Sequence, residues 1–176
     1  MPLIEYDEPE RFIAGTVGEP GQRTFFLQAV QGARITSVSL EKEQVSVLAE
    51  RLNDLLDEVG QSDEQVLPPD NDPLSTPIED EFRVSTLSLA WVAEVQRVVI
   101  ECHDRDVQLE DSGDEVVELT EPDATVLRIV LSPIAAREFA RRGLATVASG
   151  RPPCPFCGAP LEASGHICPR ANGYRR

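Results

Sequence analysis

VSVLAERLNDLL (residues 45–56) and AREFARRGLATV (residues 136–147) place apolar residues at the same positions. In both stretches these residues recur at intervals of three and four, which is the spacing of one face of an α-helix. The matched pairs are Val45 with Ala136, Leu48 with Phe139, Ala49 with Ala140, Leu52 with Gly143, and Leu56 with Val147. Two helices of the same pattern predict an internal duplication in which both pack on a common core.

Three β-like runs precede each helix and complete the predicted repeat. Their residue types favour strands, and short turns rich in glycine separate the first three runs. The first set is residues 11–17, 23–30 and 34–40 before a helix at 41–59, and the second is 82–90, 97–103 and 125–131 before a helix at 133–148. Phe12 is matched with Phe82, and Arg23 with Arg97. The expected fold is α+β, with duplicated βββα units forming antiparallel sheet with two packed helices.

The ends of the predicted helices carry recognised signals. Ser132 before Pro133 supplies an N-cap and a proline at the first helical position. Gly60 and Gly150 follow the two helices, where glycine can adopt the left-handed C-cap conformation. These signals predict a duplicated domain over residues 1–150, with halves at about 11–60 and 82–150, and a separate C-terminal segment over residues 151–176.

Charge is distributed unevenly along the 176 residues, whose formal net charge is -15. Two acidic stretches, residues 61–81 and 104–123, are predicted to be solvated loops, and disorder is their default because like charges repel and little apolar surface is available. The sequence has no apolar run long enough to cross a bilayer, and it begins without the blocks of a signal peptide. The expected location is cytoplasmic, without membrane contact.

The C-terminal segment carries a metal-ligand pattern. Cys154 and Cys157 are separated by two residues and followed by Gly158, which lets backbone amides approach a thiolate. His166 and Cys168, two residues apart, point the same way if the chain is extended there. Three thiolates and an imidazole favour tetrahedral zinc over magnesium or calcium. We therefore expect one structural zinc ion, held in a small zinc ribbon-like knuckle.

These cysteines have three alternative roles. Iron could replace zinc, the Cys-x-x-Cys pair could be redox-active, or the site could have lost its metal. A redox role is disfavoured because the motif lacks the βαβ context of thioredoxin-like proteins. A catalytic zinc is disfavoured because four protein ligands leave no position for water.

The tail after Cys168 is short and basic. The metal would fix where it begins, and its residues could contact acidic groups of the same chain or of a partner. The alternative is a frayed chain end. The predicted partner-binding residues are Arg170, Asn172, Tyr174, Arg175 and Arg176.

Several phrases resemble a known family: FIAGTVGEPGQRTFFLQA (12–29), LEKEQV (40–45), DEFRV (80–84), GRPPCPFCG (150–158) and GHICPRANGYRR (165–176). The chain is similar to an uncharacterised actinobacterial family catalogued only as a domain of unknown function. The resemblance implies no chemistry. It does imply partners among the products of neighbouring genes, which in the family encode a phosphatase of the phosphoglycerate-mutase type and a protein resembling phosphatidylinositol kinases. The chain departs from the family at Cys102-His103.

Three classes of function remain. An enzyme would need a reactive centre, but Cys102 and His103 are neighbours on a predicted strand, so their side chains point to opposite faces, the cysteine buried and the histidine on the surface. A nucleic-acid-binding protein could use the basic C-terminal zinc segment, although a charge of -15 opposes approach to phosphates. The sequence favours the third class, a zinc-stabilised protein-interaction module or adaptor of unknown biological role.

Overall fold

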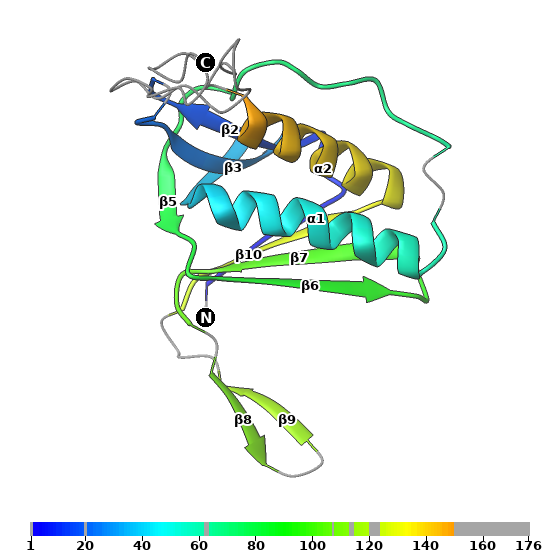
Figure 1. Cartoon of the computed structure of the whole chain (residues 1–176). Helices are drawn as coiled ribbons and strands as arrows, with labels where there is room; N and C mark the ends of the chain where they lie inside the picture. The colour runs from blue at the N-terminus through cyan, green and yellow to red at the C-terminus, as the bar shows by residue number, and fades with distance from the viewer. Residues whose placement is uncertain are drawn as a thin grey trace, which may run out of the picture.

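The computed structural model describes residues 2–19, 21–61, 64–106, 108–112, 115–119 and 124–149. In this part of the chain the fold is α+β, with two four-stranded sheets, a two-stranded hairpin and two helices (Figure 1). The elements are β1 (Leu3–Asp7), β2 (Arg11–Val17), β3 (Thr24–Gln31), β4 (Arg34–Leu40), α1 (Lys42–Glu58), β5 (Asp80–Arg83), β6 (Thr86–Val92), β7 (Arg97–His103), β8 (Gln108–Ser112), β9 (Glu115–Leu119), β10 (Val126–Leu131) and α2 (Pro133–Ala148).

Each four-stranded sheet combines strands from both halves of the chain. One sheet, called sheet B, has the order β2-β3-β4-β5, and the other, sheet A, has the order β1-β10-β7-β6. Three strands of each sheet pair antiparallel, as the meanders of the sequence predict. The fourth strand pairs parallel and comes from the other half: β5 joins β4, and β1 joins β10. Each half therefore contributes one short strand to the sheet of the other.

The predicted helices form with the expected bounds. Ser132 caps α2, because its hydroxyl oxygen accepts a hydrogen bond from the backbone N–H of Ala135 at 3.2 Å. At the start of α1, the backbone N–H of Glu41 donates to the side-chain oxygen of Gln44 at 2.7 Å. Gly60 follows α1 with φ +76°, the left-handed conformation expected after a helix. Gly150 lies outside the described residues.

One core receives side chains from both sheets and both helices. The apolar faces of α1 and α2 pack against each other and against the inner faces of the sheets. Leu48 and Phe139, matched in the predicted repeat, are 3% and 1% exposed. The ring of Phe139 stacks on that of Phe12, with centroids 4.5 Å apart and an angle of 17° between the planes. This contact ties α2 to β2 at the centre of the molecule.

The acidic linker, residues 59–79, is ordered over its described part and covers the outer face of sheet B. Leu74 is buried there with Ile13 and Phe26. Gly15 makes room for it, because a Cβ at that position would lie 2.6 Å from the Leu74 side chain. Gln28 fixes the same segment by donating to the Ser75 carbonyl and accepting from its N–H, at 2.9 and 2.7 Å. Residues 61–79 contain no helix or strand in their described part and are mostly exposed, as predicted, but Leu74 and Ser75 anchor this loop to sheet B, which the sequence did not predict.

Two further expectations need correction. Residues 82–90 do not form one strand, because β5 belongs to sheet B and β6 to sheet A. Phe82 therefore lies on β5 and is not the counterpart of Phe12 on β2. The second acidic stretch, residues 104–123, contains the antiparallel hairpin β8–β9 and is not a plain loop. Among the described residues, neither helix combines the length and hydropathy needed to cross a membrane.

Candidate functional site

The residues predicted to bind metal and partner lie outside the described residues. In the described ranges, no group of three or more His, Cys, Asp or Glu side chains is placed to hold a metal ion. The zinc site and the basic tail therefore stay predictions of the sequence. They are Cys154, Cys157, His166 and Cys168 for the metal, and Arg170, Asn172, Tyr174, Arg175 and Arg176 for a partner.

Cys102 and His103 are both buried, which corrects the expectation of a surface histidine. Cys102 faces the core, and burial raises the pKa of its thiol to about 12, so the thiol stays protonated at neutral pH and is a poor nucleophile. His103, on the opposite face of β7, is 3% exposed. Its Nε2 lies 3.3 Å from Glu101, but neither ring nitrogen has a hydrogen-bond partner among the described residues. The pair does not form a Cys–His dyad.

The most elaborate polar cluster joins α2, β2 and the linker, and we call it the Asp70 clasp. Arg142, on α2, is 9% exposed and donates from Nε to the carbonyl of Ala14 on β2 at 2.8 Å. Its Nη1 donates to the backbone carbonyl of Asp70 at 2.8 Å and lies 3.2 Å from the Asp70 carboxylate. Arg11, on β2, donates to both carboxylate oxygens of Asp70 at 2.8 and 3.1 Å.

A second pair of charges on α2 supports the clasp. Glu138 accepts a hydrogen bond from the backbone N–H of Asp70 at 2.9 Å and is paired with Arg141 at 2.7 Å. The hydrogen bond from Arg11 is the main cause that holds the pKa of Asp70 below its ordinary value. Burial lowers the pKa of Arg142. These contacts neutralise the charge of Asp70. They also hold the linker over the line of contact between α2 and β2, which we call the α2–β2 seam.

The cavity beside the Asp70 clasp is small and partly closed by the linker. It has a volume of about 290 Å³, and Leu67 and Pro68 of the linker line it together with Phe12 and Phe139. It has no exposed nucleophile among its lining residues. Of its charged lining residues, Arg11, Asp70, Glu138 and Arg142 are engaged in the clasp, and Glu10 accepts a hydrogen bond from the backbone N–H of Gly32. We therefore infer that the Asp70 clasp has a structural role, which is to hold the linker against α2 and β2.

The seam between α1 and β6 is open, in contrast to the seam between α2 and β2. A groove of about 490 Å³ lies there, lined by Leu48, Leu55, Leu87 and Leu89 and by the charged residues Arg51, Asp54 and Glu58. Among the described residues, β6 pairs with no strand along its outer edge. This groove is the candidate docking surface of the body, and the sequence analysis did not identify it.

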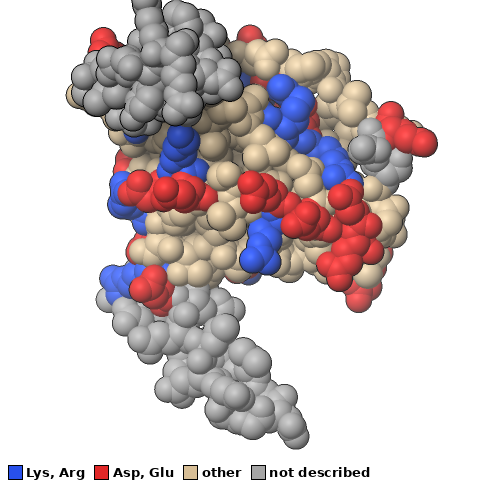
Figure 2. Space-filling model, viewed as in Figure 1, with Lys and Arg blue, Asp and Glu red and all other residues tan. Residues whose placement is uncertain are grey.

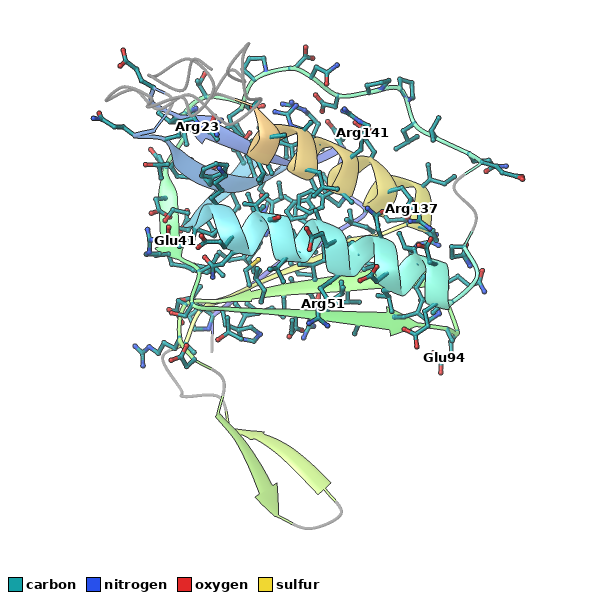
Figure 3. All side chains as sticks on the ribbon, viewed as in Figure 1. Arg23, Glu41, Arg51, Glu94, Arg137 and Arg141 are labelled. Carbon is teal, nitrogen blue, oxygen red and sulfur yellow. The ribbon has the colours of Figure 1, made fainter. Side chains whose placement is uncertain are left out.

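The rim of the groove is acidic. Figure 2 shows acidic side chains, with a few basic ones among them, along the exposed side of α1. Asp54 and Glu58 line the groove, whereas Asp57 is paired with Arg137 on α2. Figure 3 places Arg51 on the side of α1 that faces β6, with Arg141 on the far side of the helix pair beside the linker. Arg51 is the one basic residue among those that line the groove, and in the described ranges it makes no hydrogen bond or ion pair.

Comparison with known proteins gives a family but no function. A family model described as "Protein of unknown function (DUF3090)" matches residues 4–168. No curated protein and no solved structure matches the chain. The match includes the described body and the metal-ligand motif, up to Cys168, in a single family unit. The chain therefore belongs to the family of unknown function DUF3090.

Proposed function

We propose that the protein is a zinc-stabilised protein-interaction module or adaptor. In this proposal the α+β body is a scaffold, the segment 151–168 is held by one zinc ion, and the tail 169–176 contacts the partner. The observation that carries the proposal is the burial of Cys102 and His103. Because the body uses these two in packing, every remaining cysteine and histidine lies in one short stretch, Cys154 to Cys168.

The ligand set suits a structural zinc ion. Cys154, Cys157, His166 and Cys168 supply three thiolates and one imidazole, which complete a tetrahedral shell. Zinc would then hold the segment in a defined conformation, because metal binding to a short ligand-bearing stretch is also folding free energy. The tail that begins at Pro169 would leave the zinc site in a fixed direction.

Charge indicates the class of partner. The described body is acidic, and the tail is basic through Arg170, Arg175 and Arg176. A phosphate backbone is densely and uniformly negative, so the acidic body opposes it more strongly than it opposes a protein that is acidic only where the tail binds. The family resemblance points to phosphatase-like or kinase-like products of neighbouring genes as candidates, with nucleic acid as the alternative.

We infer further that the body arose by duplication. The exchange of β1 and β5 supports this inference, because each strand precedes its own meander yet pairs with the last meander strand of the other half. Opposite residues also agree: Leu27 pairs with Val38 in sheet B, and Ile100 pairs with Ile129 in sheet A. Pairing by this register replaces Phe82 with Leu87 as the counterpart of Phe12.

Replacing Arg175 and Arg176 with glutamine should weaken binding to the partner by about tenfold at low salt, and by less at high salt. The affinity of the full-length, zinc-loaded chain for purified neighbouring-gene products is measured by titration calorimetry. The matched control is Lys42→Gln with Arg83→Gln, which removes two exposed charges from the body and should leave the affinity unchanged. Equal affinities for the two variants would refute the role of the tail, and copurified nucleic acid would favour the alternative.

A further inference from the structure

The proposed duplication relates the two halves of the body residue by residue, which allows their surfaces to be compared. The strand pairing places Phe12 with Leu87 and Ala14 with Leu89. The helix register of the sequence matches Leu48 with Phe139. Leu52 is matched with Gly143 in the same register. Arg51 directly precedes Leu52 and Arg142 directly precedes Gly143, so the two arginines correspond. The seam between α1 and β6 is thus the counterpart of the seam between α2 and β2.

The first seam shows how such a surface is covered. The chain leaving α1 runs along α2 (Figure 1), and Leu67, Pro68 and Asp70 line the cavity there. Arg142 joins the two sides, because it binds the edge carbonyl of Ala14 and the linker residue Asp70. The covering segment is therefore the stretch of chain that follows the helix of the other half.

The second seam has the same receptor features without a covering segment among the described residues. Val47 lines it and is 52% exposed. Arg51, which corresponds to Arg142 in the repeat, also lines it, but Arg51 is exposed whereas Arg142 is buried under the linker. In the strand register, Leu89 on β6 corresponds to Ala14, whose carbonyl accepts the hydrogen bond from Arg142. A groove that is lined by four leucines and by an arginine without a partner in the described ranges has the composition of a covered surface.

We propose that the groove between α1 and β6 is occupied by the chain's own zinc-binding segment, residues 150–168, with Glu162 paired to Arg51. This segment follows α2 as the linker follows α1, and it is of similar length. Arg23 holds the end of α2 by donating to the carbonyls of Thr146 and Ser149, so the segment starts from a fixed point.

Charge supports the same occupant. Glu162 is the only acidic residue in 150–176, and it lies about as far beyond α2 as Asp70 lies beyond α1. Arg151 would lie near Asp54 and Glu58, the two acidic residues that line the groove. The family match also runs through residue 168, so the segment is part of the same family unit as the groove. This docking rests on the proposed zinc site only because zinc would give the segment 150–168 its shape.

Docking is tested with two exposed valines in the full-length, zinc-loaded chain. Val47→Asp places a charge in the groove, and Val95→Asp places the same charge at the β6–β7 turn, where Val95 is 59% exposed. Val47→Asp should raise hydrogen exchange in peptides from β6 and from 150–168 by about tenfold, and Val95→Asp should not. Equal exchange in both variants would overturn the proposal, as would protection of the groove that depends on protein concentration, which would indicate a second copy.

The ion pair is tested by charge exchange. Arg51→Glu alone and Glu162→Arg alone should each raise exchange in 150–168, and the double variant should restore it, since the pair is reversed. No restoration would overturn the pairing. Zinc content is measured on the same samples: loss of zinc with retained protection would reject the metal site alone, and retained zinc without protection would reject the docking alone.

Discussion

Replacing Phe139 with alanine is expected to lower the free energy of unfolding by about 3–5 kcal/mol. Phe139 is 1% exposed and stacks on Phe12, so its removal leaves a cavity where α2 meets β2. The neighbouring backbone is held by helix and sheet hydrogen bonds and cannot collapse into that space.

Urea unfolding followed by circular dichroism measures the effect. Phe82→Ala is the matched control, because Phe82 lies on the short strand β5 and is only partly buried. We expect the control to lower the free energy of unfolding by about 1–2 kcal/mol, because folding buries less apolar surface at Phe82 than at Phe139. A loss at Phe139 no larger than that at Phe82 would contradict the placement of Phe139 at the centre of the core.

Replacing Asp70 with asparagine is expected to lower the free energy of unfolding by about 2–3 kcal/mol at pH 7. The substitution keeps the shape of the side chain but removes the charge that two arginines share. Arg142 is the more costly of the two to leave unpaired, because it is 9% exposed. Asp72→Asn is the control, since Asp72 is exposed and offers only its backbone carbonyl to Arg11.

The pH dependence of this effect has a definite sign. The pKa of Asp70 is lowered in the folded protein, chiefly by the hydrogen bond from Arg11, so folding favours the ionised form. The contribution of ionised Asp70 to the free energy of unfolding is complete above its ordinary pKa of 3.8. It is lost as the pH falls from 3.8 through the lower pKa of the folded protein. The stabilities of the wild type and Asp70→Asn should therefore converge in acid, as measured by urea unfolding at pH 7 and at pH 3. A difference that persists unchanged in acid would show that the charge of Asp70 is not its cause.

The helices and the antiparallel meanders could be predicted because their signals are local. A helical apolar face, an N-cap at Ser132 and a turn at Gly18 depend on neighbouring residues alone. The exchange of β1 and β5 could not be predicted. Both strands are short, and their parallel pairing with β10 and β4 depends on distant partners and not on a local turn.

The Asp70 clasp was missed for a related reason. Asp70 lies in an acidic, proline-rich stretch without a base, where composition alone predicts a solvated loop. The arginines that neutralise it lie 59 and 72 residues away in sequence. A usable signal was present in the apolar residues Leu67 and Leu74, since apolar side chains within an otherwise acidic stretch favour contact with the body.

Zinc content, measured on the full-length chain, tests the central claim most directly. Native mass spectrometry of protein purified under reducing conditions without chelator should show about one zinc ion per chain. Cys168→Ser should release the metal while hydrogen exchange in the inner strands of both sheets is unchanged, because the main core is formed by residues before 150. A metal-free wild-type chain, or a disulfide between Cys154 and Cys157 in reduced protein, would contradict the zinc-stabilised module.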